Sequence, residues 1–396
     1  IVFEIPSNVI LKKTRASIWL SSIMLVWGIA TVAIAFVTNF AGLFVCRIIL
    51  GMAQSGYIPG ILYQMSLVYK PREVSTRVAL LLTMASISGI VSGPIAYGCS
   101  FLEGHLGRHG WQYLFIVEGV PTIALSLISF FALFDDIQDV RWLTPEQKAL
   151  QYIRMNHSAS QPHLPITLKT FINVISDYKV YLFGLIYMMS ATNHTSFAIF
   201  VPTIIKGFGY PVLTSQLLSA PPSIICAIFT LLGGYLSDHF NQCRSILAMV
   251  GFGLLSIGYG LLLVLEDTWQ LYGVLFIIPT GIGLFVAPVV CWSAVSFPDL
   301  ATRAVAVGTV VMIGNTGGVI ASFLYPYNPA DPRHFFGNMF NICVGITGFI
   351  LTAILGCCLR RLNKRMDQLE QENKIMDHQE NNHHHSKNDT QFRYLY

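Results

Sequence analysis

Apolar segments of about 20 residues recur along the whole chain, and they constrain its fold more than any other feature. Ten follow one another, at residues 18–38, 41–64, 77–101, 112–134, 180–204, 214–236, 246–265, 270–292, 303–325 and 337–358. Only 11% of the residues are charged, whereas a soluble domain carries about 25%. A polypeptide crosses a bilayer either as an α-helix or as part of a closed β-barrel. Apolar segments of this length are typical of spanning helices, so the sequence predicts an all-α polytopic membrane protein.

The ten residues before the first span, IVFEIPSNVI, are too few to cross a bilayer, and the basic sequence LKKTR follows them directly. They lack the basic start and the small-residue cleavage site of a signal peptide. We interpret them as the second half of a spanning helix, with its first half and the helix before it absent from the sequence. One half-helix and ten complete spans are therefore expected.

A polar stretch separates the spans into two groups. Within it, Thr144, Pro145 and Gln147 have the order that opens an α-helix, a hydroxyl before the helix and a glutamine three residues later. We predict a first helix bundle at residues 1–134, a linker at 135–178, a second bundle at 179–358 and a tail at 359–396.

The tail places Leu362, Leu369 and Met376 at heptad spacing after a basic start. This spacing is typical of a short amphipathic or membrane-surface helix, and the composition also suits a solvated, partly disordered tail. His383 to His385 have no companion ligand in the sequence, so no metal site is expected.

The two groups of spans share an order of features. In the first, a helix broken by Pro59 precedes Arg77 and a glycine-rich helix. In the second, a helix that we expect to be broken by the proline of TGIGLFVAP, at residues 280–288, precedes Arg303 and another glycine-rich helix. Such weak internal symmetry is typical of transporters built from two halves, with the substrate between them near the middle of the membrane. The sequence thus favours two six-helix bundles.

Lysine and arginine are distributed unevenly between the two ends of the spans. When LKKTR is placed in the cytoplasm, 20 of the 24 basic residues fall on that side and only Arg108, Lys206 and Arg333 on the other. Short cytoplasmic loops carry such an excess, so the linker and tail are predicted to be cytoplasmic. The net charge of +4 follows from this distribution, and no nucleic-acid partner is expected.

The sequence contains no motif of an enzyme. It has no phosphate-binding loop for ATP, no Gly-x-Ser-x-Gly, no His-Glu-x-x-His and no zinc spacing among its cysteines. We therefore expect no enzymatic activity, no cofactor and no metal, so an ion gradient must supply the energy. A membrane potential that is negative inside opposes an entering anion by about 2.3 kcal/mol per charge per 100 mV, so anion uptake would need protons as a second partner.

Arg47 is the only lysine or arginine that we place inside a span, in the sequence RIILGMAQSGYIPG. A charge in the middle of a spanning helix costs about 2.5 to 3.5 kcal/mol, so such residues are functional candidates. Gln54 lies two helical turns later on the same face, with Gly51 between them. The guanidinium suits a carboxylate substrate; alternatively, it extends toward the membrane surface or ties helices together.

The span at 180–204 has a polar cluster in its middle, from which we select Asn193 and His194 for contact with substrate or protons. Histidine titrates near neutral pH and suits proton transfer. Glu118 lies inside another span, where burial would keep its carboxyl protonated, and Asn315 lies in the glycine-rich sequence GNTGG. For each of these residues, a hydrogen bond between helices is the alternative.

Six stretches occur in order along the chain to residue 358. They are FEIPSNVILKK, RIILGMAQSGYIPG, GWQYLFIVEG, FAIFVPTIIKGFGYPVLTSQLLSAPP, GGYLSD and MIGNTGGVIASFLYP. Together they resemble the fungal anion:cation symporter family of the major facilitator superfamily, the group of allantoate, pantothenate and nicotinic acid permeases. The resemblance implies the major facilitator fold of twelve helices, alternating access and proton-coupled uptake of small carboxylates at the plasma membrane.

Two positions depart from the pattern of that family. Gln54 stands where a glutamate is usual, and Ser296 stands where an asparagine is usual. The neutral side chain at position 54 removes one candidate proton site, so the coupling of the family does not transfer unchanged.

We therefore expect a monomeric permease for a small organic anion, with protons and the lipid bilayer as its other partners. The predicted site consists of Arg47, Gln54, Asn193, His194 and Asn315 for the substrate, and of His194 and Glu118 for protons. Two alternatives stay open, a non-transporting sensor or decayed transporter, and an exporter of a secondary metabolite.

Overall fold

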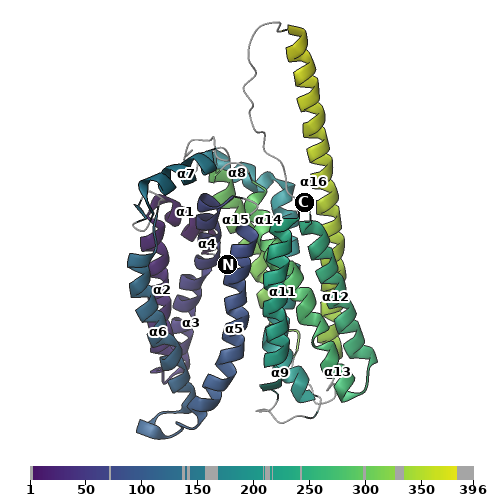
Figure 1. Ribbon diagram of the computed structural model, residues 1–396. Helices are drawn as coiled ribbons and strands as arrows, with labels where there is room; N and C mark the ends of the chain where they lie inside the picture. The colour runs from purple at the N-terminus through teal and green to yellow at the C-terminus, as the bar shows by residue number, and fades with distance from the viewer. Residues whose placement is uncertain are drawn as a thin grey trace.

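The computed structural model describes residues 3–70, 73–135, 139–140, 143–156, 168–207, 209, 215, 217–240, 243–297, 300–325 and 334–380. Every regular element in these residues is a helix, and the helices form two bundles that lie side by side (Figure 1). The predicted all-α membrane fold is therefore confirmed. The three consecutive histidines of the tail lie outside the described residues.

The helices follow the predicted spans in order. The first bundle contains α1 (Glu4–Lys13), α2 (Ala16–Ile34), α3 (Phe40–Ser55), α4 (Tyr57–Val68), α5 (Val74–Ser100), the short 3-10 helix η1 (His105–Gly107) and α6 (Gly110–Ala132). Between the bundles lie α7 (Pro145–Asn156) and α8 (Leu168–Ser176). The second bundle contains α9 (Tyr178–Gly207), α11 (Ala220–His239), α12 (Arg244–Val264), α13 (Thr268–Val274), α14 (Ile277–Val295), α15 (Leu300–Ala321) and α16 (Phe335–Glu380).

Eight helical segments in the described part of the chain are long and apolar enough to cross a membrane. Two more helices, α9 with 30 residues and α15 with 22, have a spanning length but are not among the eight. In α9, the polar side chains around Asn193 and His194 lower the mean hydropathy of the segment. Each of the ten predicted spans thus has a helical counterpart.

Two of the spans are broken into two helices, and each break lies four residues before a proline. α3 ends at Ser55, four residues before Pro59, and Leu275, directly after α13, lies four residues before Pro279. A proline ring clashes with the carbonyl group four residues earlier and removes a helical hydrogen bond. The break predicted at TGIGLFVAP is wrong, because α14 continues through Pro288.

The linker helix is present as predicted, and the described part of the tail, which ends at Glu380, is helical. At the start of α7, the backbone N–H of Thr144 donates to the Gln147 side chain (3.0 Å) and the backbone N–H of Gln147 donates to the Thr144 hydroxyl (3.3 Å), which is a capping box. α16 continues past residue 358 to Glu380 and projects beyond the bundle at the end where α7 and α8 lie (Figure 1).

The second bundle has a dense aromatic core. The rings of Phe252 and Phe285 stack with centroids 4.4 Å apart, and Phe183 meets Trp292 edge-on at 5.5 Å. All four side chains are almost completely buried, as is 83% of an apolar 18-residue stretch within the span Thr268–Val295. The aromatic rings thus form the buried centre of this bundle around α14.

Glycines bring α9 and α15 together in this bundle. A Cβ atom at Gly314 would overlap the Tyr187 ring, and one at Gly317 would overlap the Met188 carbonyl and Thr192. Small residues at such positions let helix backbones approach closely. The glycines of the sequence GNTGG thus permit the close approach of α15 to α9.

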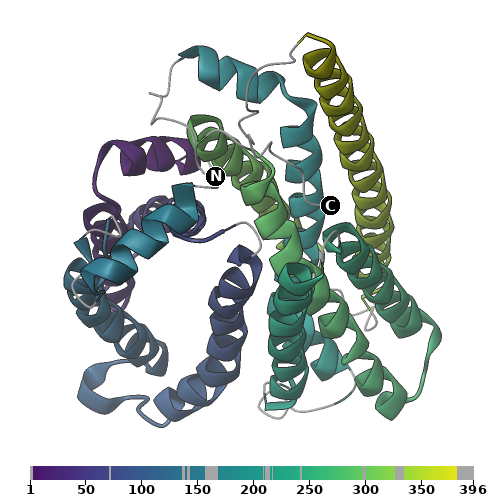
Figure 2. The same ribbon diagram turned by 45° about the horizontal axis from the view of Figure 1, so that its top comes forward.

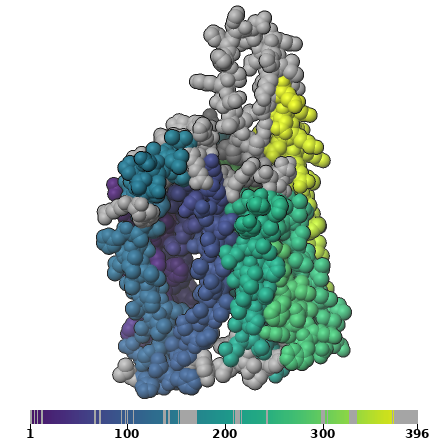
Figure 3. Space-filling model, viewed as in Figure 1, coloured from purple at the N-terminus to yellow at the C-terminus, as the bar shows by residue number. Residues whose placement is uncertain are grey.

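The first bundle is open by comparison. Within each of the spans Phe40–Met65 and Gly110–Ala132, only 11% of an apolar 18-residue stretch is buried. Figure 3 shows the surface hollowed between α5 and α6, with atoms of the earlier helices at the floor of the hollow. The faces of this bundle are therefore accessible to small solutes.

The bundles touch through α5 against α11 and α1 against α15 (Figures 1 and 2). Near the end that carries the linker helices, apolar side chains from both bundles form one layer. Its buried members are Leu62, Val74 and Val78 from the first bundle and Val290, Cys291, Ala294, Val307 and Val311 from the second. We call this set the linker-side layer, and it closes the junction at that end.

Candidate functional site

The face of α3 that carries Arg47, Gly51 and Gln54 is exposed along its length. A Cβ atom added to Gly51 would meet nothing within 4 Å, so no helix in the described part of the chain covers this face. The guanidinium carbon of Arg47 lies 5.8 Å from the centroid of the Phe115 ring of α6. Such a cation–π contact holds the guanidinium plane while leaving its N–H groups available.

Glu118 lies one helical turn beyond Phe115 on α6, and it is exposed. The burial expected for this carboxyl is therefore not found. The reason lies in the packing of α6, which turns the neighbouring Gly119 toward α2, where its backbone approaches Gly28 and Val32. Glu118 consequently faces away from that contact, on the open side of the bundle.

The polar cluster of α9 divides between two surroundings. Asn193 is completely buried, and its amide nitrogen donates to the Met189 carbonyl (3.0 Å), while Thr192 donates to the Met188 carbonyl (2.8 Å) and packs on Gly317. His194, the next residue, is only half-buried. Thr192 and Asn193 on the buried side of the cluster therefore take part in helix packing, whereas His194 on the other side is partly exposed.

Asn315 of α15 forms a bond between the two bundles. Its amide nitrogen donates to Oε1 of Glu4 on α1 (2.6 Å), across a sequence separation of 311 residues. Glu4 is 1% exposed. Asn315 was selected from the sequence as a substrate contact, and the structure places it against a buried carboxyl.

The predicted site residues thus fall in three places within the described chain. Arg47 and Gln54 lie on the open side of the first bundle, as does Glu118. Asn315 lies at the junction of α1 and α15, and Asn193 lies inside the second bundle next to half-buried His194. Arg47 contacts the ring of Phe115, which lies one helical turn before Glu118 on α6.

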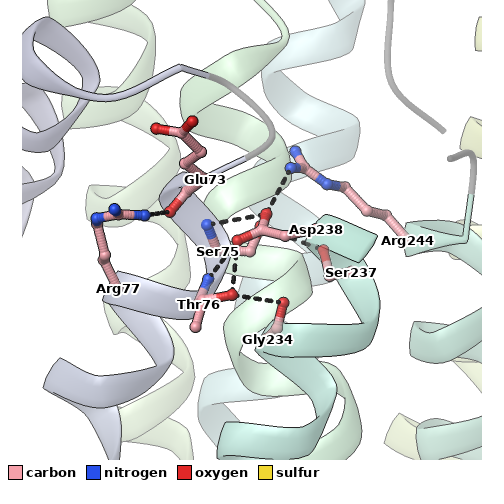
Figure 4. Close-up of polar contacts among 8 residues, drawn as sticks. All are labelled: Glu73, Ser75, Thr76, Arg77, Gly234, Ser237, Asp238 and Arg244. Atoms are coloured by element: carbon pink, nitrogen blue, oxygen red, sulfur yellow. Dashed lines mark hydrogen bonds and ion pairs between the residues drawn. The ribbon is translucent and has the colours of Figure 1, made fainter. Parts of the chain in front are cut away.

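A second polar site, absent from the sequence-based prediction, lies where α11 meets α5 (Figure 4). The backbone N–H groups of Ser75 and Thr76 donate to the Asp238 carboxylate (3.2 and 2.7 Å), and the Thr76 hydroxyl donates to it as well (2.8 Å). Arg244 Nη2 lies 3.6 Å from Asp238 Oδ1, and this arginine is 2% exposed. The carboxylate therefore caps the first turn of a helix in the other bundle, where N–H groups lack helical partners and the helix dipole favours negative charge.

This capping contact lies beside the linker-side layer and ties the same end of the two bundles. Arg77 helps to fix the start of α5, since Nη1 donates to the Glu73 carbonyl (2.7 Å) and its guanidinium carbon lies 4.0 Å from the Tyr69 ring centroid. We call the Asp238 contact the linker-side clasp. It can hold one end of the junction shut while the other side stays open.

The sequence carries a weak signal for the clasp. In GGYLSDHFNQCR an acid at the end of a span precedes Arg244 by six residues. The orientation of the spans was predicted with Arg244 counted as a basic residue of a cytoplasmic loop. In the structure, Arg244 is the first residue of α12 and is almost completely buried. The partner segment at Ser75 is 162 or more residues away, so no local pattern could pair the two.

Comparison with known proteins identifies the family. Residues 1–324 match the family model described as the Major Facilitator Superfamily. The chain belongs to this superfamily. It is therefore a membrane transporter and not an enzyme.

Relatives in the Major Facilitator Superfamily cover most of the chain. The MFS transporter prlL of Fungal sp. (strain NRRL 50135) is 28% identical over 366 residues, which is 91% of this chain and 73% of that protein. A protein of Agrobacterium vitis named for tartrate transport is 27% identical over 356 residues, which is 89% of this chain and 78% of that protein. Among solved structures, the proton:xylose symporter XylE matches with a TM-score of 0.67 at 14% identity, over 89% of this chain and 83% of that chain. The similarity to XylE shows the major facilitator fold.

Proposed function

We propose that the protein takes up a small organic carboxylate together with protons by alternating access, as a multi-pass protein of the plasma membrane with its linker and C-terminus in the cytoplasm. The observation that carries this proposal is Arg47, a cation on an exposed face of the spanning helix α3. The tartrate named for one relative is a carboxylate and supports the substrate class.

The chemistry of Arg47 favours an anion. A guanidinium offers paired N–H donors that match the two oxygens of a carboxylate. Arg47 forms no ion pair within the described chain, and its contact is the ring of Phe115. A cation inside the membrane that is not neutralised by a protein carboxylate is suited to neutralisation by the substrate.

The other predicted residues complete the proposed site. Gln54, two turns from Arg47 on the same exposed face, can donate to or accept from a polar substrate. Asn193, His194 and Asn315 contribute from the second bundle when the bundles close around the substrate. His194 and Glu118 lie on the proposed proton path, since both are titratable, with Glu118 exposed and His194 half-buried.

Alternating access requires that the two ends of the junction open in turn. The linker-side layer and the linker-side clasp are closed in this structure. With the linker in the cytoplasm, this conformation faces outward. Release of the substrate inside the cell would require that Asp238 leave the first turn of α5.

The experiment that tests the proposal compares two arginines that both stack on phenylalanine. Arg47→Ala should lower uptake of the transported substrate about 10- to 100-fold, because a hydrogen bond to a charged group contributes about 1.5 to 3 kcal/mol. Arg108 lies 4.8 Å from the Phe36 ring, outside the spans, and Arg108→Ala should leave uptake unchanged. Radiolabelled nicotinate, pantothenate, allantoate and tartrate are tested in a gene-deleted host at several pH values.

Three outcomes separate the possibilities. Uptake that depends on Arg47 and rises at acidic outside pH supports the proposal. Equal uptake by Arg47→Ala and the unaltered protein contradicts the role of Arg47. Absence of uptake for every tested anion, with the protein present at the cell surface, contradicts the substrate class.

A further inference from the structure

One side of α16 is exposed from the membrane span into the tail. On the opposite side, Leu355 and Leu359 are completely buried in the second bundle, where α16 packs on α12 and α9. The exposed side changes in character near residue 358. Before this point its large side chains are apolar, namely Ile346, Phe349, Ile350 and Ile354. After it, three exposed side chains are basic, namely Arg361, Lys364 and Arg365. We call these three residues the basic patch.

Helical periodicity puts the basic patch on the same side as the exposed apolar residues. Lys364 lies 18 residues, or five turns, after Ile346, and Arg361 lies 11 residues, or about three turns, after Ile350. A continuous exposed apolar side of a spanning helix is a surface for lipid. The basic patch therefore also faces the lipid, at the point where the helix leaves the bilayer.

The basic patch lies at the depth of the lipid headgroups. The predicted span ends at residue 358, so Arg361 and Arg365 follow its end by three and seven residues, or about 5 and 10 Å along the helix. The headgroup region on one side of a bilayer is about 5 to 8 Å thick. Because arginine and lysine side chains are long and extend toward polar surroundings, all three charges can reach the phosphate groups.

The basic patch is not neutralised within the described part of the chain. No ion pair there includes any of its three residues. By contrast, Lys179 at the start of α9, at the same end of the protein, has its Nζ 3.6 Å from Oδ2 of Asp177. Like charges one turn apart on a helix repel each other, so an anion that lies among the three cations would stabilise them.

We propose that the basic patch binds the phosphate groups of anionic phospholipids in the leaflet on the linker side. A guanidinium offers two parallel N–H donors to phosphate oxygens, and the Lys364 ammonium adds a further positive charge. Zwitterionic phospholipids carry no net charge that could neutralise three cations. The inference rests on the proposed orientation, in which this end of the protein is cytoplasmic, because the cytoplasmic leaflet is the one rich in anionic lipids.

The experiment measures the binding of phosphatidylserine and phosphatidylcholine to the full chain in detergent, by native mass spectrometry. The unaltered protein should bind phosphatidylserine more tightly. The triple variant Arg361→Gln, Lys364→Gln, Arg365→Gln should bind it about 10- to 100-fold more weakly, with phosphatidylcholine binding unchanged, because each basic residue near an anionic surface contributes about five-fold.

A matched pair of lysines provides the control. Lys364→Gln alone should weaken phosphatidylserine binding about five-fold. Lys179→Gln should leave it unchanged, because Asp177 already lies beside that ammonium group. Soluble glycerophosphoserine, which has the same headgroup without acyl chains, is added as a competitor and should not displace the lipid at equal concentration.

Four outcomes would overturn the proposal. Equal binding of the two lipids by the unaltered protein would mean that the patch is not a lipid site, and an acidic protein segment would become the candidate occupant. An equal loss in Lys364→Gln and Lys179→Gln would mean that charge anywhere at this end suffices. Displacement by glycerophosphoserine would assign the patch to soluble phosphates. If the triple variant does not fold, the three single variants are measured, and no loss in any of them overturns the proposal.

The proposed function is tested separately. The lipid measurements need neither a substrate nor a pH gradient, so a failure to take up any carboxylate would contradict the proposed function and leave the lipid result standing. An epitope tag at the C-terminus that antibodies reach from outside intact cells would overturn the proposed orientation. The cytoplasmic leaflet would then be excluded as the source of the lipid.

Discussion

The two bundles of the protein differ in how closely their helices approach one another. In the second, Gly251 and Gly281 face each other so closely that a Cβ atom on either would meet the carbonyl of the other. In the first, Gly51 and Gly89 have no atom within 4 Å of where a Cβ would be. The second bundle, which we call the rigid bundle, thus brings these two helix backbones into contact, whereas the first has open faces beside the close contact of Gly119 with α2. The open faces carry the candidate substrate contacts.

The largest expected effect comes from filling a glycine in the rigid bundle. Gly281→Val should prevent folding or destabilise the protein by about 3 kcal/mol or more, because the backbone of the neighbouring helix cannot move away. Gly51→Val, in open space on α3, should leave stability unchanged or slightly raised. Yield of monodisperse protein and thermal midpoint in detergent measure both. If the two variants lose the same yield and thermal stability, the face around Gly51 is covered and the two bundles do not differ in packing.

Removal of the linker-side clasp should separate the bundles without unfolding either one. Asp238→Ala should raise the labelling of Cys291, in the linker-side layer, about ten-fold by a membrane-impermeant maleimide added to inside-out vesicles, with the other cysteines replaced by serine. The matched control is Asp135→Ala. Asp135 accepts from the Ser17 backbone N–H (2.7 Å) and hydroxyl (2.9 Å), so it caps a helix within one bundle.

The control separates opening from general loosening. Asp135→Ala should lower the thermal midpoint and leave Cys291 unlabelled. If both variants expose Cys291, the clasp has no special part in closing the junction.

A buried hydrogen-bond network in the rigid bundle should contribute more to the free energy of unfolding than an exposed hydrogen bond in the other bundle. The Tyr325 hydroxyl donates to Asn338 Oδ1 and accepts from Asn341 Nδ2, both at 3.0 Å. Tyr325→Phe removes one hydrogen bond from each of these two buried amide groups and should cost about 1 to 3 kcal/mol. Tyr113→Phe, which removes an exposed bond to the His105 carbonyl, should cost less than about 0.5 kcal/mol. Thermal unfolding compares the two, and a larger loss for Tyr113→Phe would contradict the ranking.

The smallest effect concerns the loop before α6 in the open bundle. Glu103 accepts from the Gly110 backbone N–H (2.5 Å) and contacts His109 Nδ1 (2.8 Å), and these bonds lower the pKa of its carboxyl below the ordinary 4.5. A lowered folded-state pKa stabilises the protein above 4.5, and this contribution is lost as the pH falls through the folded-state value. The thermal midpoint of the unaltered protein should therefore fall slightly more below pH 4.5 than that of Glu103→Gln. Parallel curves would contradict this.

Features set by local sequence could be predicted, and features set by distant contacts could not. The spans followed from apolar length, and the capping box of α7 followed from Thr144 and Gln147, because both depend on neighbouring residues. The break in the second bundle was placed at the wrong proline. Pro279 lies in the first turn of α14, four residues after the break at Leu275, whereas Pro288 lies in the interior of the same helix.

The candidate site was predictable only in its residue types. Arg47 and Gln54 were correctly placed on one face of one helix, because helical periodicity fixes that relation. The burial of Glu4 and the exposure of Glu118 depend on which helix packs where, and both are glutamates within apolar sequence. Asp238 caps a helix that begins more than 160 residues earlier in the chain, which no local spacing reveals.

The length of α16 has a mechanical consequence. The residues after the predicted membrane span, from 359 to Glu380, continue the same helix, and at 1.5 Å per residue they extend about 33 Å. Because the helix is unbroken, a tilt of the second bundle by about 10° would displace its tip by about 6 Å. A small rotation inside the membrane would thus become a displacement large enough for another molecule on the linker side to detect.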